Sequence, residues 1–532
     1  MRGEAARPAS DAIACCDNRV NLIDFFVEND VIRCDHSFGG LLARVSSVLG
    51  SFMRKARVIA LTAGAGALAS AFVAGGAAAA PAATAAGASG AAAATPTVVI
   101  KPGVHQLPQA KTLSTPWTTA LCESQLGIAC YQPDQIRAAY NEAPLLGKGI
   151  TGKGATIVIV DSFGSPTIKS DLSTFDKQFG YPDPPSFKIL TPAGKIPAWD
   201  PNNADMTGWA GETTLDVEYA HAVAPGANIV LVETPVAETE GVTGFPEIVK
   251  AEKYVIDHGI GDVISQSLDA TEETFTSYQQ LEPLRAAYKD AYAHGVTVLA
   301  ATGDDGATNA ELDGTTLYTK PVTGWPSTDP LVTAVGGTQL KEGSDGTFSS
   351  VVWNDTYDVP LQQAFTGTSG PSPFSTGGGV SEFFSRPWYQ GGVARVTGAA
   401  RGVPDISLSG ACDGAVTMYT SYPGDPVGWH LVCGTSEATP LFSGFVALAD
   451  QVAHHRLGLI NPALYALSAV RAPGLVDVTQ GNNTVSFTQG EANTLYTVKG
   501  YSAKPGYDLV SGVGTINAAS FVPELAWRAV GF

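Results

Sequence analysis

Short apolar runs separated by longer mixed segments dominate the chain from residue 155 onward. The runs are rich in Val, Ile, Leu and Ala, which is typical of strands buried on both faces of a parallel sheet. Helix-like segments lie between several of them, for example residues 245–258 and 281–294. This alternation predicts an α/β fold with a mostly parallel sheet and helices on both faces. The predicted strands are residues 155–160, 228–233, 263–267, 297–301, 331–335 and 415–419.

Another apolar pattern, near the N-terminus, has the layout of a secretory signal. Met53 opens a basic stretch, residues 58–73 are modestly apolar, and Ala78-Ala79-Ala80 offers a cleavage site. We therefore interpret residues 1–52 as an upstream extension from a start codon assigned too early, and residues 53–80 as the signal peptide. A single membrane anchor is the alternative, which the Gly- and Ala-rich apolar stretch disfavours.

The remaining chain divides by composition. Residues 81–115 begin with a low-complexity stretch rich in Ala, Gly, Ser, Thr and Pro, and we predict a linker followed by a short pro-segment. Residues 116–532 have the composition of a globular domain. The formal charge of −19 argues against binding to nucleic acid or to an anionic membrane surface.

Four cysteines remain once residues 1–52 are set aside, and an even number in an exported chain predicts disulfides. Cys122 and Cys130 would close a short loop, and Cys412 and Cys433 would join neighbouring strands, although spacing alone does not fix the pairing. No cysteine or histidine spacing indicates a zinc site.

The phrase Gly434-Thr435-Ser436 lies between an apolar run and a helix-like segment, residues 438–452. A Ser at a strand-to-helix turn can present its hydroxyl beside backbone N–H groups that would receive an oxyanion. The simpler interpretation is a Ser that caps a helix.

Two carboxylate motifs accompany this Ser. Glu212 and Asp216 are four residues apart and therefore share one face of a predicted helix. If they are held close together and away from water, they would share a proton, and one of them could accept a proton from a nucleophile. The alternative is a solvated acidic face. Asp304 follows the apolar run 297–301, where Gly-Asp is also common in plain turns.

The three motifs around Glu212 and Asp216, Asp304 and Ser436 occur in the order found in the sedolisin family. This family comprises the serine-carboxyl peptidases on a subtilisin-like fold, and residues 132–532 resemble it. The resemblance implies that Ser436 is the nucleophile of an acyl-enzyme, Glu212 the general base and Asp216 its orienting partner. Asp304, with the Ser436 N–H, would bind the oxyanion. It also implies peptide hydrolysis in acid. The family usually carries a large folded prodomain, for which residues 81–115 are too few.

The same resemblance implies one structural calcium ion near the C-terminal end. Its ligands would be the side chains of Asp477 and Asp508 and the carbonyls of Val478, Lys504 and Gly506. Lys504 stands where the family usually has Gly. The alternative is two Asp-bearing loops without a metal.

Two other functions compete with this interpretation. One is a Ser-His-Asp subtilisin with Asp161, His221 and Ser436, although His221 lies beyond the part of the helix that would face the Ser. The other is a non-catalytic secreted binding protein on a peptidase scaffold, which the intact set of four predicted catalytic residues disfavours. We therefore expect a secreted monomer acting on protein or peptide substrates, with no nucleic-acid partner and no stable membrane association after signal cleavage.

Overall fold

The computed structural model describes residues 105–108 and 111–529, so the predicted upstream extension and signal peptide lie outside the described residues. An eight-stranded sheet forms the centre of this unit, in the order β11-β10-β8-β6-β3-β5-β4, with β14 also paired to β10. Every pair is parallel except β10 with β11. The strands are β3 (Thr156–Ser162), β4 (Phe187–Leu190), β5 (Asn228–Thr234), β6 (Val263–Gln266), β8 (Thr297–Ala301), β10 (Thr333–Glu342), β11 (Phe348–Val352) and β14 (Ile406–Ser409).

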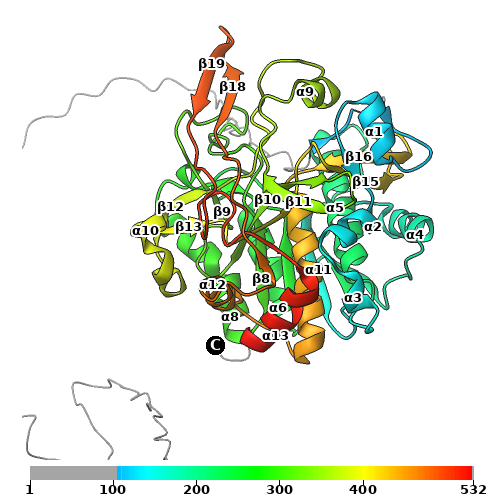
Figure 1. The fold of residues 1–532 in the computed structure, drawn as a ribbon, viewed down its shortest axis with the longest axis vertical. Coiled ribbons are helices and arrows are strands. Elements are labelled where there is room, and N and C mark those ends of the chain that lie inside the picture. The colour runs from blue at the N-terminus through cyan, green and yellow to red at the C-terminus, as the bar shows by residue number, and fades with distance from the viewer. Residues whose placement is uncertain (1–104, 109–110, 530–532) are drawn as a thin grey trace, which may run out of the picture. The chain divides into compact units, whose positions relative to one another are not determined.

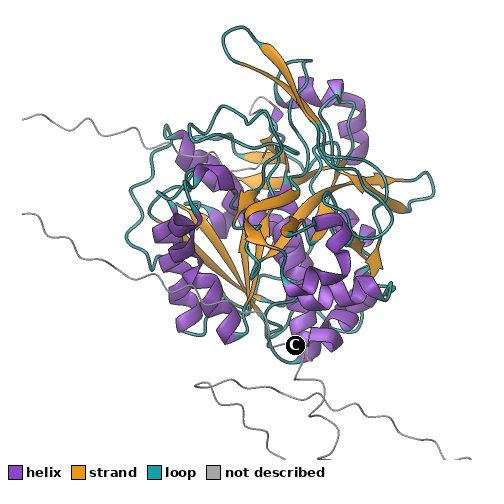
Figure 2. Cartoon of the chain, turned by 90° about the vertical axis from the view of Figure 1, so that its left-hand side faces the viewer, coloured by secondary structure: helices purple, strands orange, loops and turns teal. Residues whose placement is uncertain are grey.

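Side chains of each central strand alternate between two apolar cores. In β3, Ile157 and Ile159 belong to the core shared with helices α5 (Ala204–Val223) and α11 (Thr435–Ala453). Val158 and Val160 belong to the core shared with α6 (Phe245–Asp257) and α8 (Ala286–His294). Helices therefore cover both faces of the sheet, as Figure 2 shows. The predicted α/β fold is confirmed.

A smaller sheet lies beside the start of α11, in the order β1-β16-β15-β2. The predicted strand 415–419 is β15, but it pairs with β16 and β2 rather than with the central sheet. The apolar pattern of this strand does not show which of the two sheets it joins, because a strand buried on both faces fits either sheet. The strands are β1 (His105–Gln106), β2 (Cys130–Tyr131), β15 (Ala415–Thr420) and β16 (Gly428–Cys433).

The predicted helix 281–294 is shorter than expected. Residues Glu282–Arg285 form a 3₁₀ turn, and α8 begins only at Ala286. Pro283 has no backbone N–H and fixes its own φ, which suits a tight first turn. In the part of the chain that the structure describes, no helix combines the length and the apolar character needed to cross a membrane.

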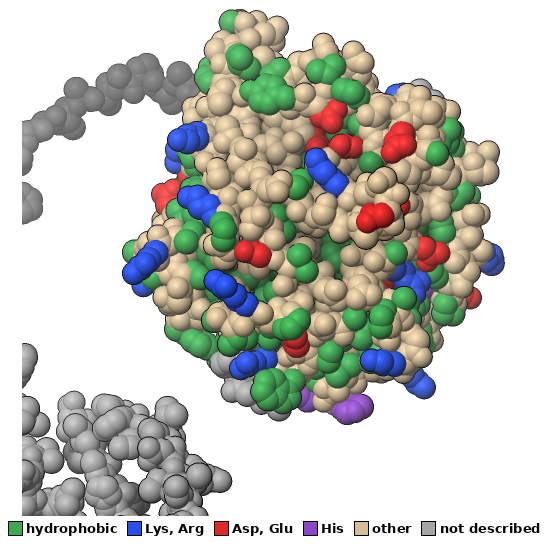
Figure 3. All heavy atoms as spheres, in the orientation of Figure 1, with side chains coloured by type: hydrophobic (Ala, Val, Ile, Leu, Met, Phe, Trp, Pro, Cys, Tyr) green, Lys and Arg blue, Asp and Glu red, His purple; other side chains and the backbone are tan. Residues whose placement is uncertain are grey.

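The remaining elements surround these two sheets (Figure 1). The other helices are α1 (Thr119–Gln125), α2 (Pro133–Ala139), α3 (Ala143–Leu146), α4 (Ile168–Phe179), α7 (Tyr278–Leu281), α9 (Val359–Phe365), α10 (Ala394–Thr397), α12 (Asn461–Ala469) and α13 (Ala518–Ala529). The two-stranded pairs are β7 (Ala270–Thr271) with β9 (Gly324–Trp325), β12 (Gly379–Ser385) with β13 (Ala400–Val403), β17 (Leu475–Val476) with β20 (Thr515–Ile516), and β18 (Val485–Gln489) with β19 (Thr494–Val498). On the face drawn in Figure 3, acidic and basic side chains are interspersed.

Candidate active site

Ser436 lies at the turn between β16 and α11. The strand ends at Cys433, Gly434 takes a φ of 137°, and the helix begins at Thr435. Residues with a Cβ rarely adopt such a φ, so Gly434 permits the abrupt change from strand to helix. Ser436 is therefore in the first turn of α11, where backbone N–H groups have no partner within the helix. The predicted strand-turn-helix at Ser436 is confirmed, although the helix starts three residues earlier than expected.

Glu212 and Asp216 lie on α5 and are fully buried. The alternative of a solvated acidic face is therefore wrong, because the helix packs against both the central sheet and α11. The Ser267 hydroxyl lies 3.0 Å from each carboxylate oxygen of Asp216. This bond joins α5 to the end of β6 and holds the Asp216 side chain in place.

The helices α5 and α11 approach each other closely at Gly444. A Cβ on this glycine would lie 2.6 Å from Cβ of Val223 and 3.2 Å from the carbonyl oxygen of Ala220. Real Cβ atoms essentially never come so close to Cβ atoms, so only glycine allows this separation. The close packing sets the helix that carries Ser436 directly against the helix that carries the two carboxylates.

Asp304 follows β8 and is tied to the nucleophile turn. Its Oδ1 accepts hydrogen bonds from the Thr435 backbone N–H and the Thr435 hydroxyl, both at 2.7 Å. Its Oδ2 has no hydrogen-bond partner among the described residues. Burial raises the pKa of Asp304 well above its ordinary value, and the charges of Asp305 and Glu212 raise it further, although the Thr435 bonds oppose the shift. A carboxyl in these surroundings holds its proton and can donate a hydrogen bond.

The carboxyls around α5 cannot all ionise together. Burial raises the pKa of Asp216 well above its ordinary value, and the charges of Asp161 and Glu212 add to that effect. Burial likewise raises the pKa of Asp161 to about 7, with a further contribution from Glu233. Groups coupled in this way share protons and lose them in separate steps.

A cavity of about 190 Å³ lies beside Ser436, and Thr435, Asp304 and Ser267 are also in its wall. Burial is the main cause of the raised pKa of Asp304 and of Asp216, and the charge of Glu212 adds to the rise in both. Ser436, Glu212, Asp216 and Asp304 were predicted as one site from three separate stretches of sequence. The fold brings these stretches together, through the first turn of α11, the buried face of α5 and the loop after β8.

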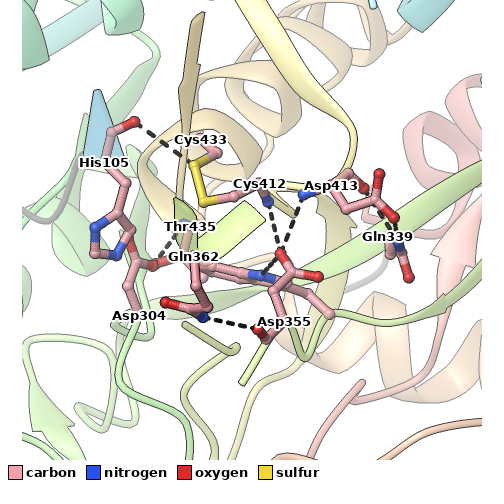
Figure 4. Close-up of a disulfide and its surroundings, with 10 residues drawn as sticks. His105, Asp304, Gln339, Asp355, Gln362, Cys412, Asp413, Cys433 and Thr435 are labelled. Atoms are coloured by element: carbon pink, nitrogen blue, oxygen red, sulfur yellow. Dashed lines mark hydrogen bonds and ion pairs between the residues drawn. A yellow bond between two sulfur atoms is a disulfide. The ribbon is translucent and has the colours of Figure 1, made fainter. Parts of the chain in front are cut away.

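His105 also lines this cavity, and the sequence interpretation missed it. It lies in β1, which pairs antiparallel with β16 and places His105 opposite Cys433 (Figure 4). Its ring packs on Phe374, with centroids 4.0 Å apart, and its Nε2 lies 3.9 Å from Oδ2 of Asp304. Burial lowers the pKa of His105 to about 4. The segment resembled a linker because no local pattern shows that two residues will pair with a distant strand.

Both disulfides are formed as paired in the sequence interpretation, Cys122 with Cys130 and Cys412 with Cys433. The second joins the nucleophile strand to the residues before β15, and Asp355 accepts hydrogen bonds there from the backbone N–H groups of Cys412 and Asp413 (Figure 4). Cys433 Sγ lies 3.6 Å from the His105 carbonyl oxygen. This is a packing contact, because a disulfide sulfur carries no hydrogen.

His221, the base of the alternative Ser-His-Asp site, has other partners. Its Nε2 lies 2.9 Å from the carbonyl oxygen of Pro182 and 3.3 Å from Oδ1 of Asp176, and its Nδ1 has no hydrogen-bond partner among the described residues. Neither ring nitrogen contacts Ser436. The buried imidazole instead joins the end of α5 to α4 and the loop that follows it.

The residues predicted to hold calcium lie in two adjacent C-terminal loops. The Gly506 N–H donates to Asp477 Oδ2 at 2.8 Å, and the Lys504 N–H donates to Asp508 Oδ2 at 2.8 Å. The Val478 carbonyl lies 3.3 Å from the Ser511 hydroxyl. Among the described residues, no group of three or more acidic, His or Cys side chains could hold a metal, so most ligands would be backbone carbonyls. Calcium accepts such a set, because it binds six to eight oxygens in flexible geometry.

Comparison with known proteins gives three kinds of match. The sequence profile of the Subtilase family matches residues 193–491, which is more than half of the chain. Kumamolisin from Bacillus sp. (strain MN-32) is 32% identical over 394 residues, covering 72% of this chain and 62% of kumamolisin. Tripeptidyl-peptidase 1 from Bos taurus is 28% identical over 455 residues, covering 80% of this chain and 69% of that protein.

Sedolisin from Pseudomonas sp. (strain 101) is 29% identical over 283 residues, covering 53% of this chain and 43% of sedolisin. A solved structure of Pseudomonas sedolisin, a serine-carboxyl proteinase in complex with pseudo-iodotyrostatin, matches with a TM-score of 0.59 and 24% identity. The match covers 76% of this chain and all of that one, and it supports a shared fold. The chain spans only 62% of kumamolisin and 43% of sedolisin.

Proposed function

Because this chain belongs to the subtilase family, and within it to the sedolisins, we propose that it is a serine-carboxyl peptidase that hydrolyses peptide bonds through Ser436. One observation carries the proposal: Ser436 and Asp304 line one cavity, and Ser267 in the wall of that cavity donates a hydrogen bond to the buried Asp216, which shares a helix face with the buried Glu212.

The chemistry begins with the Ser436 hydroxyl, which attacks the carbonyl carbon of the substrate while Glu212 accepts its proton. Asp216 orients Glu212 and is itself held by Ser267. The oxyanion of the tetrahedral intermediate receives hydrogen bonds from protonated Asp304 and from the Ser436 N–H. The intermediate collapses to an acyl-Ser436, Glu212 returns its proton to the leaving amine, and water then releases the acyl group by the reverse sequence.

Acid conditions suit this arrangement because of the proton on Asp304. Asp304 must keep its proton to donate a hydrogen bond, and burial raises its pKa well above the ordinary value. Activity is therefore expected to be present at low pH and to fall as the pH rises through the pKa of Asp304. A histidine base would require the opposite dependence, since it must be neutral to accept a proton.

We further propose that the protein is secreted and that a calcium ion stabilises the C-terminal loops. Two disulfides support an oxidising compartment. The ion would be held by the side chains of Asp477 and Asp508 and the carbonyls of Val478, Lys504 and Gly506. It would supply positive charge that offsets the Asp477 and Asp508 carboxylates, and Asp477 and Asp508 would hold the two loops together through it.

The test is hydrolysis of a peptide library by the purified protein from pH 2 to 8, with Ser436→Ala as the comparison. We expect a maximum in acid and no cleavage by the variant, while its melting temperature stays close to that of the parent. A neutral optimum, or substantial cleavage by folded Ser436→Ala, would contradict the proposal.

A further inference from the structure

Strand β1 holds His105 next to the nucleophile turn. Its backbone pairs with β16, so that His105 lies opposite Cys433, three residues before Ser436. The imidazole ring packs on Phe374, with centroids 4.0 Å apart, and makes an edge-type contact with the ring of Trp353, at 6.5 Å. Backbone pairing and ring contacts together therefore fix where the imidazole lies.

Two buried polar atoms lie 3.9 Å apart at this point of the cavity, Nε2 of His105 and Oδ2 of Asp304. Neither atom has a hydrogen-bond partner among the described residues. The Asp304 side chain is 6% exposed, and the His105 side chain, which covers it, is 24% exposed. Buried polar atoms without partners are uncommon in native proteins, which indicates that this pair has a role.

The contacts of Asp304 decide which of its two oxygens carries the proton. Oδ1 accepts two hydrogen bonds, one from the N–H and one from the hydroxyl of Thr435. An oxygen that accepts two donors serves as the carbonyl oxygen of a neutral carboxyl, so the proton belongs on the other oxygen. That other oxygen, Oδ2, is the one beside His105.

Burial keeps both members of this pair neutral. It lowers the pKa of His105 to about 4 and raises the pKa of Asp304 well above its ordinary value. A histidine and an aspartate at this distance could form an ion pair, but burial disfavours the charged form of each. A neutral imidazole with its proton on Nδ1 presents a lone pair at Nε2. An acceptor at this place disfavours the Asp304 carboxylate and favours its protonated form.

The other ionisable groups near Asp304 act in the same direction. The charges of Asp305, next in the chain, and of Glu212 on α5 raise the pKa of Asp304. Asp304 in turn raises the pKa of Asp269 and of Glu437 on α11. Among the described residues that line the cavity, none is a Lys or an Arg. The imidazole is therefore the group in this wall that could bring positive charge to Asp304, and only while it is neutral does Asp304 keep its proton.

We propose that His105 is a positioning residue for the oxyanion acid: as a neutral imidazole, it keeps the proton of Asp304 on Oδ2 and keeps water away from that oxygen. The inference deepens the proposed peptidase function and rests on it. When the tetrahedral intermediate forms, the proton on Oδ2 is already inside the cavity and can be donated to the oxyanion. A charged His105 in an ion pair with Asp304 would instead leave no proton for this hydrogen bond.

The experiment is the pH profile of kcat/KM for the parent, His105→Ala and His105→Gln on one peptide. In His105→Ala, water reaches Oδ2 and the acceptor beside it is lost, so the carboxylate is better stabilised. The pH at which activity falls by half should therefore move down by roughly one unit or more, and the loss of kcat/KM should be smallest at the lowest pH. His105→Gln keeps an uncharged side chain with an acceptor oxygen and should restore the midpoint of the parent.

Gln106→Ala is the matched control on the same strand. Gln106 contacts Asp425 and His430 instead of Asp304, so its loss loosens β1 without changing the wall beside Oδ2. The melting temperature should fall, and the midpoint of the pH profile should stay that of the parent. An equal shift of the midpoint in Gln106→Ala and His105→Ala would overturn the proposal, because a loosened strand would then account for both.

Three further outcomes in His105→Ala would also overturn it. An unchanged midpoint, or a loss of kcat/KM that is equal at every pH, would leave His105 with a structural role only. A midpoint that moves up would show that a charged His105 forms an ion pair with Asp304. Should His105→Ala not fold, His105→Asn takes its place, because its side chain is too short to bring an acceptor to the position of Nε2.

Failure of the proposed function gives a different result. If the parent cleaves no peptide, the protonation of Asp304 is followed directly, by the carboxyl C=O stretch in the infrared difference spectrum between the parent and Asp304→Asn. A titration midpoint of this signal that falls in His105→Ala would retain the role of His105 without a peptidase. An unchanged midpoint would overturn that role as well.

Discussion

Two groups of buried carboxyls in this molecule differ in the number of hydrogen-bond donors around them. Around Ser436, Asp216 and Asp304 are buried with few donors, and the pKa of each is raised well above its ordinary value, first by burial. In the C-terminal loops, Asp508 is also buried, but it accepts hydrogen bonds from the backbone N–H groups of Lys504, Val510 and Ser511. These donors oppose the rise in its pKa that burial causes.

The number of donors decides whether a buried carboxyl is suited to exchange a proton or to bind a cation. A buried carboxyl with few donors is favoured in its neutral form, which can donate or exchange a proton. A carboxylate surrounded by backbone N–H groups is stabilised in its charged form, which can bind a cation. We therefore expect changes around Ser436 to alter activity and its pH dependence, and changes in the C-terminal loops to alter stability.

The largest effect is expected for Glu212→Gln. Loss of the general base should lower kcat by roughly 10²- to 10⁴-fold, because proton transfer to the base accompanies the attack. Glu252→Gln is the control, since Glu252 is equally buried but lies on α6 rather than on α5. If Glu212→Gln stays folded and keeps its kcat, Glu212 is not the base.

The second effect concerns stability and pH. Buried carboxyls with a raised pKa bind protons on folding, so their contribution to stability is complete below their unfolded pKa of about 4 and is lost as the pH rises through the folded value. The melting temperature should therefore fall between pH 4 and pH 8 at constant ionic strength. A rise over this range would contradict the assignment. Burial raises the pKa to about 7 or 8 in Glu142, Asp161, Glu233, Glu240, Glu272, Asp305 and Asp355.

The third effect is a change in melting temperature when the proposed calcium ion is removed from the C-terminal loops. A ligand that binds only the folded state at a hundredfold excess over its Kd adds about 2.7 kcal/mol to the free energy of unfolding. Chelation at pH 5 should therefore lower the melting temperature of the parent and have no effect on Asp508→Asn. Asp257→Asn, at an exposed position on α6, should respond to chelation as the parent does. An unchanged melting temperature after chelation, with no metal in the purified protein, would exclude the site.

The smallest effect on activity is expected for His221→Gln. His221 contacts Asp176 and the Pro182 carbonyl, so the loss should reduce stability by roughly 1–3 kcal/mol through an unpaired buried group. The ratio kcat/KM should be unchanged in the folded variant. A large loss of kcat/KM without loss of stability would favour the Ser-His-Asp alternative.

The central strands and the catalytic helices could be predicted because their signals are local. The strand predicted at residues 155–160 is β3 at Thr156–Ser162, and Glu212 and Asp216 share the buried face that their spacing indicates. Each of these signals depends on neighbouring residues only, and together they indicate one candidate site.

The contact between Glu238 and Asp269 and the pairing of strand β1 could not be predicted in this way. Glu238 and Asp269 are 31 residues apart, and their shared position depends on how the loops after β5 and β6 pack. His105 reaches the cavity only through pairing with a strand more than three hundred residues away. Neither arrangement leaves a periodic pattern, because each is formed by tertiary packing.

The pairing of β1 with β16 also has a consequence for the order of folding. His105 and Cys433 are partners in this pairing although more than three hundred residues separate them. Contacts so distant in the sequence form slowly, because the long loop between them must close before the contact stabilises the fold. We therefore expect the wall of the cavity that His105 provides to form late, after the central sheet.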